Sequence, residues 1–95
     1  AASALSFPTQ LTSSTATQVQ VASLRNCLYL ITLDDAAGSP VVATRGVLQG
    51  GAPPATVTLP KAKLAPGAYR VDVRLASQVN PGTVTRLLSP PVSTD

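Results

Sequence analysis

The sequence predicts an all-β domain, a sandwich of two antiparallel sheets built from about seven short strands. Proline and glycine interrupt the chain at short intervals, and the segments between them are rich in Val, Thr and Leu. Several of these segments alternate apolar and polar residues, as half-buried strands do. A chain of 95 residues has room for one domain. We expect this domain to span 1–95, with short extensions at 1–8 and, rich in proline, at 89–95.

Residues 69–75 form the clearest predicted strand. Their odd-numbered positions are Tyr, Val, Val and Leu, whereas the even-numbered positions are Arg70, Asp72 and Arg74. Because successive side chains of a strand point to opposite faces, the odd positions should be buried and the three charged residues solvated.

Shorter strands are expected elsewhere along the chain, at 3–7, 17–21, 41–45, 55–59 and 83–88. Pro8 indicates an edge strand or a break after the first of these. Pro60 ends the strand that precedes it, since proline has no N–H to donate to a neighbouring strand.

Residues 23–33 allow two interpretations. Ser23 would cap a helix whose apolar residues recur at helical spacing, namely Leu24, Cys27, Leu28 and Ile31. However, 28–33 is a short apolar run containing Tyr, Ile and Thr, and it ends in the turn-forming residues 34–38. We favour a central strand buried on both faces, preceded by a turn at Arg25-Asn26.

Residues 64–73, Leu-Ala-Pro-Gly-Ala-Tyr-Arg-Val-Asp-Val, resemble a turn and strand of fibronectin type III and bacterial immunoglobulin-like domains. In these families the first Tyr of the strand forms a tyrosine corner, in which its hydroxyl bonds to upstream backbone. The resemblance implies an immunoglobulin-like sandwich, with Tyr69 buried and bonded near Lys63 or Leu64. Residues 29–38 resemble a strand and turn of the bacterial modules. Paired cysteines and Trp are absent, which excludes the antibody branch.

The side-chain inventory argues against an enzyme. The chain has no His and no Glu, which excludes His-based catalysis and carboxylate pairs built on Glu. Cys27 has no imidazole to activate it, and a zinc site needs His or further Cys. Gly50-Gly51 is followed closely by two prolines, which lack the N–H donors of a phosphate loop. We therefore predict no catalytic, cofactor-binding or metal-binding residue.

Two small clusters of like charge have alternative interpretations. Asp34-Asp35 would contribute carboxylates to a Ca²⁺ site, but this ion takes about six to eight oxygen ligands, so a solvated turn is preferred. Lys61 and Lys63 would meet an anionic partner or lie in a solvated loop, and the loop is preferred.

Charge and hydropathy limit the remaining classes. The net charge is +3 and the basic residues are scattered, so we expect no nucleic-acid partner. No apolar stretch is long enough to cross a membrane. Cys27, the only cysteine, is expected to be a buried thiol between the sheets; an intermolecular disulfide or a reactive thiol is the alternative. The start at Ala1 fits either removal of an initiator Met or cleavage of an export signal.

These exclusions favour a non-catalytic structural or interaction module that decorates or builds a larger repetitive assembly. A virion decoration or tail component and a cell-surface fibre both fit, so we expect the protein in a virion or at the cell surface, with cytoplasmic synthesis before assembly also compatible. The expected partners are protein subunits, either copies of the chain or a scaffold, contacted through strand edges and termini. The alternative is an accessory carbohydrate- or protein-binding domain of a larger exported enzyme or adhesin.

Overall fold

The computed structural model describes residues 2–6, 17–23, 25–60, 63–79, 82 and 84–93, the first of these by backbone alone. All the regular structure in these ranges is β-strand, as predicted. The strands are β1 (Ala2–Ser6), β2 (Gln18–Ser23), β3 (Cys27–Asp34), β4 (Pro40–Leu48), β5 (Ala55–Thr58), β6 (Ala68–Ser77), β7 (Val84–Leu88) and β8 (Val92–Ser93). The part of the expected first strand at Phe7, and Pro8 after it, lie outside the described residues.

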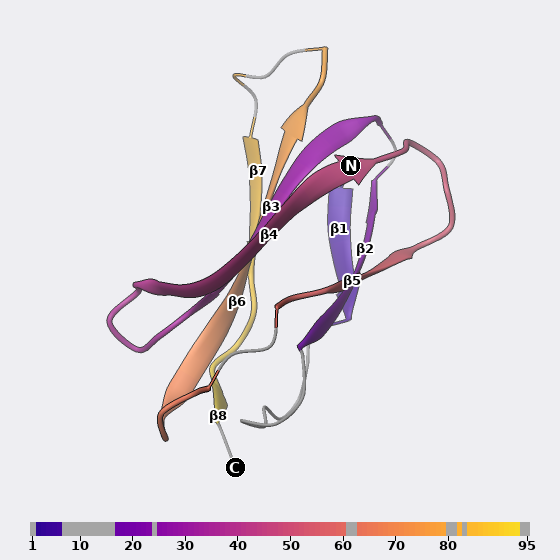
Figure 1. The fold of residues 1–95 in the computed structure, drawn as a ribbon. Coiled ribbons are helices and arrows are strands. Elements are labelled where there is room, and N and C mark those ends of the chain that lie inside the picture. The colour runs from indigo at the N-terminus through magenta and orange to yellow at the C-terminus, as the bar shows by residue number, and fades with distance from the viewer. Residues whose placement is uncertain are drawn as a thin grey trace.

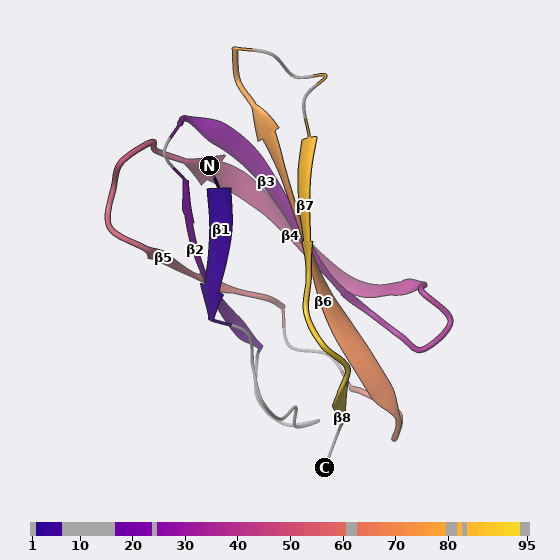
Figure 2. The same cartoon turned by 180° about the vertical axis from the view of Figure 1, so that it is seen from behind.

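The strands form two antiparallel sheets. The smaller sheet has the order β1-β2-β5, and the larger has the order β4-β3-β6-β7, with β8 paired to β6 beyond the end of β7. Figures 1 and 2 show the smaller sheet beside one face of the larger one. The two sheets share one core, in which Val19 and Val57 of the smaller sheet join Ile31 and Val73 of the larger. The prediction of an all-β fold with two antiparallel sheets is therefore confirmed.

The strand interpretation of residues 27–34 is correct, but the expected burial on both faces is wrong. β3 lies between β4 and β6, and its Cys27, Ile31 and Leu33 face the core. Leu28, on the other face, is 46% exposed because no described strand lies over that side of the larger sheet (Figure 2). Ser23 does not cap a helix; its hydroxyl accepts a hydrogen bond from the Arg25 N–H at 3.2 Å and so shapes the predicted turn.

The alternation predicted for residues 69–75 holds at the odd positions, all of which are buried. Arg70 and Arg74 are exposed, also as predicted. Asp72 is not: its side chain is only 1% exposed, because arginines from β6 and β7 cover it. The sequence pattern assigns each residue to a face but does not tell which neighbours on that face will fold over it.

Tyr69 occupies the predicted corner at the start of β6. The residue is 6% exposed, and its hydroxyl donates a hydrogen bond of 2.6 Å to the carbonyl oxygen of Ala65. The acceptor lies one residue beyond the predicted Lys63 or Leu64. Gly67 lies between donor and acceptor in the chain and has a φ of +153°, a backbone conformation that residues other than glycine rarely adopt. The turn therefore brings the Ala65 carbonyl back over the tyrosine hydroxyl.

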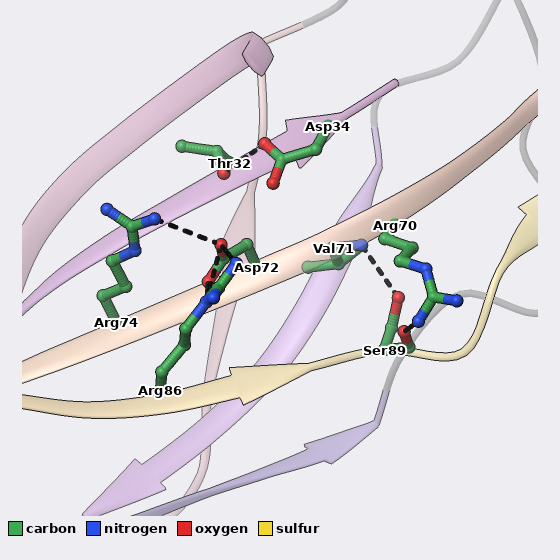
Figure 3. A network of polar contacts seen from close by, with 8 residues as sticks. All are labelled: Thr32, Asp34, Arg70, Val71, Asp72, Arg74, Arg86 and Ser89. Atoms are coloured by element: carbon green, nitrogen blue, oxygen red, sulfur yellow. Dashed lines mark hydrogen bonds and ion pairs between the residues drawn. The ribbon is translucent and has the colours of Figure 1, made fainter. Parts of the chain in front are cut away.

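Residues 89–93 belong to the folded domain, although the sequence placed them in a Pro-rich extension. Ser89 is fully buried, Val92 lies in the core, and β8 pairs with Tyr69 and Ala68 of β6. Between β7 and β8, the hydroxyl of Ser89 accepts a hydrogen bond of 2.8 Å from the Val71 N–H (Figure 3). The Ser89 N–H in turn donates one of 2.9 Å to the Val71 carbonyl. These two bonds hold the segment between β7 and β8 against β6, just before its two prolines.

Candidate interaction surface

The outer face of the larger sheet, on the side away from β1, β2 and β5, carries most of the exposed aliphatic side chains. Of the exposed large hydrophobic residues in the described ranges, all but Val79 belong to strands of this sheet: Leu28, Val41, Val47, Val84 and Leu88. The registers place Leu28 opposite Val47, and Val84 in line with them through Ala76, whereas Leu88 lies four residues further along β7. A clustered apolar surface of this kind marks an interaction site more often than scattered single residues do.

The apolar row is the part of this face formed by one residue from each strand, Val47, Leu28, Ala76 and Val84. Direct pairing aligns them, since Leu28 lies opposite both Val47 on β4 and Ala76 on β6, and Ala76 lies opposite Val84 on β7. Val47 is 57% exposed and Val84 55%. A shallow groove of about 480 Å³ follows the row. The row thus crosses all four strands at right angles to their direction.

A second row, the arginine row, lies beside the apolar row and is offset from it by two residues on each strand. It consists of Arg45 on β4, Arg74 on β6 and Arg86 on β7, with Leu30 of β3 between the first two. Arg45 and Arg74 line the same groove as the apolar row. The groove itself is mostly apolar, and Arg45 and Arg74 border it on one side.

Asp72 neutralises one arginine of this row. Arg86 donates from Nη2 to Oδ2 at 2.8 Å and from Nε to both carboxylate oxygens at 3.0 and 3.2 Å (Figure 3). These hydrogen bonds, the charge of Asp72 and, more weakly, that of Asp34 raise the pKa of Arg86. Arg74 reaches the same carboxylate only at 3.5 Å. Because Arg74 and Arg86 lie directly opposite, the carboxylate offsets the repulsion between them.

Arg45 differs from its neighbours. It is exposed, and no carboxylate among the described residues forms an ion pair with it. Among the described residues of the outer face, Arg45, Arg70, Arg74 and Arg86 stand against Asp34 and Asp72, which leaves an excess of two positive charges. Among the described residues, Arg45 at the β4 end of the arginine row and Arg70 form no ion pair, and Arg74 holds only a contact of 3.5 Å.

The two clusters of like charge noted in the sequence, Asp34-Asp35 and Lys61 with Lys63, belong to neither of the two rows. Asp34, expected in a solvated turn, is buried and accepts a hydrogen bond of 2.7 Å from the Thr32 hydroxyl (Figure 3). Asp35 accepts from the N–H groups of Ala37 at 3.0 Å and Ser39 at 2.9 Å, which closes the turn between β3 and β4. No group of three or more possible metal ligands gathers among the residues that the structure describes. Lys63 is exposed, and Lys61 lies outside the described residues.

Cys27 is buried in the shared core, as predicted, where its thiol packs as a small apolar group. The described part of the chain contains no helix that is long and apolar enough to cross a membrane. A comparison with known protein families and with curated proteins finds no match to this chain.

One feature of the sequence indicates the outer apolar face. In 28–33 both the even and the odd positions carry apolar residues, so β3 presents Leu28 and Leu30 on the side opposite to Ile31. On its own, this pattern predicts a strand buried on both faces within the domain. The second apolar face exists, and none of the described strands covers it.

Proposed function

We propose that this protein is a non-catalytic, immunoglobulin-like module that makes subunit contacts in a larger repetitive assembly. The observation that carries the proposal is the apolar row, in which the side chains of Val47, Leu28 and Val84 are about half exposed and aligned across one sheet. Exposed aliphatic area of this kind contributes roughly 25 cal/mol per Å² when a partner removes it from water. The outer sheet face thus takes the place of the termini as the main contact surface.

Three further features support the module over an enzyme. The chain lacks His and Glu, its single thiol is buried, and the tyrosine corner agrees with the resemblance to fibronectin type III and immunoglobulin-like domains. Such sandwiches host many unrelated functions, so the proposed role rests on the surface and not on the fold. A virion component or a cell-surface fibre would use a small domain in this way.

The carbohydrate-binding alternative receives less support. Sugar sites present exposed aromatic rings for stacking, whereas Tyr69 is buried and Tyr29 is partly buried against the core. Phe7 lies outside the described residues. The exposed groups on the outer face are aliphatic or cationic, and they match a protein surface better than a sugar.

Hydroxyl-radical footprinting of the protein in material from its native source tests the proposal. Leu28, Val47 and Val84 should be oxidised rapidly in the isolated chain and protected in the assembly. Val79, which is 94% exposed and lies outside the strands, serves as the internal control and should be oxidised in both. Native protein that sediments as a free monomer, or in which the three residues react as fast as Val79, would contradict the proposal.

A further inference from the structure

We infer that the partner segment bound by the outer face is an acidic, aliphatic peptide segment. The inference rests on the proposed function and adds the chemistry of the partner. It follows from the pairing of the apolar row with an arginine row whose charge the domain only partly neutralises. A segment with aliphatic side chains along one side and carboxylates along the other would satisfy both rows at once.

The charge distribution on the outer face indicates that the partner segment is negatively charged. Asp72 accepts its short hydrogen bonds from Arg86, and Arg74 reaches it only at 3.5 Å, while Arg45 has no ion-pair partner among the described residues. A carboxylate placed between Arg45 and Arg74 would gain charge-assisted hydrogen bonds from both. A lysine there would be repelled by an excess of positive charge on the whole face.

The spacing of the rows selects the shape of the partner. Neighbouring strands lie about 4.8 Å apart, so the apolar row spans roughly 14 Å, and Arg45 and Arg74 lie roughly 9.6 Å apart. The two rows are separated by two residues, or about 7 Å along each strand. In an α-helix, residues seven positions apart are separated by about 10.5 Å, and they lie on nearly the same side. An amphipathic helix lying across the strands therefore fits an aliphatic stripe to one row and two carboxylates to the other.

Titration of the full chain with three synthetic peptides tests the inference. The first is a short amphipathic helix with a leucine stripe and a flank of glutamate; the second replaces each glutamate by lysine; the third replaces each leucine by serine. Amide chemical shifts report where each peptide binds. The glutamate peptide should bind most tightly, perturb Leu28, Val47 and Arg74, and weaken as salt is raised, since exposed ion pairs are screened.

Arg45→Glu supplies the decisive variant, because Arg45 pairs with no carboxylate in the described chain and its replacement should leave the fold intact. The substitution should lower the affinity for the glutamate peptide by about five- to tenfold and raise the affinity for the lysine peptide. Arg25→Glu makes the same charge change in the turn before β3, at a residue that belongs to neither row, and should change neither affinity by more than about twofold.

Equal binding of the glutamate and lysine peptides, binding away from the two rows, or equal losses in Arg45→Glu and Arg25→Glu would each overturn the inference. Absence of binding by the glutamate peptide would overturn it as well. The footprinting experiment is independent of these results, because protection of the apolar row in the assembly would still support a subunit contact. Conversely, selective binding of the glutamate peptide without protection in native material would leave the peptide site standing and remove the assembly role.

Discussion

The Tyr69 corner gives the sharpest test of the fold, through the substitution Tyr69→Phe. This change removes one hydroxyl and leaves the buried ring in place. The hydroxyl donates one hydrogen bond of 2.6 Å, to the Ala65 carbonyl, and Ala65 is exposed, so water can reach that region once the donor is gone. We therefore expect a typical net loss of about 1 kcal/mol in the free energy of unfolding. That loss corresponds to a fall of about 4–8 °C in Tm for a domain of this size.

Urea unfolding followed by far-UV circular dichroism measures the loss. The midpoint should fall by about 0.5–1 M while the slope of the transition stays the same. Tyr29→Phe is the matched control, because no hydrogen bond of the Tyr29 hydroxyl exists among the described residues. A loss below about 0.3 kcal/mol in Tyr69→Phe, or the same loss in Tyr29→Phe, would refute the role assigned to the corner.

Three further outcomes are expected. Removal of residues 89–95 should destabilise the isolated domain by about 2 kcal/mol or more, because the core loses Val92; an unchanged urea midpoint would contradict this. Gly46→Ala should cost about 1–3 kcal/mol, since its new Cβ would lie 2.5 Å from the Tyr29 hydroxyl oxygen, and the cost should disappear in a Tyr29→Ala background. Cys27 should react with a thiol reagent roughly a thousandfold more slowly in the native state than in urea, and rapid stoichiometric labelling would reverse its assignment to the core.

Much of the fold was predictable because period-two alternation and turn residues act locally. The odd positions of 69–75 are buried as predicted, and the strands expected at 17–21, 41–45 and 55–59 correspond to β2, β4 and β5. β4 is longer than expected, since it continues through Gly46 to Leu48, where the ring of Tyr29 fills the space beside the glycine. A glycine that normally weakens a strand is compensated here by a cross-strand aromatic neighbour.

The candidate site was less predictable because it depends on register. The apolar row and the arginine row arise only when β4, β3, β6 and β7 are aligned in one particular way. A shift of one residue in any strand would move its members to the other face. The burial of Asp72 has the same origin, since it depends on Arg86 lying one diagonal position away on β7. No periodicity within a single segment contains this information.

The C-terminal segment changes where the partner contacts should be sought. Pro90-Pro91 predict the end of a strand, because proline cannot donate to a strand ladder, and the sequence alone therefore favours assembly contacts for this segment. Ser89 overcomes this stop: its hydroxyl accepts from the Val71 N–H and its own N–H donates to the Val71 carbonyl, so the chain stays on β6 until Val92 enters the core. Residues 89–93 are thus used within the domain, and a truncation that removes them would weaken folding and assembly together. An assembly defect seen without a stability defect should instead come from substitutions at the apolar row, whose side chains contribute little to the core.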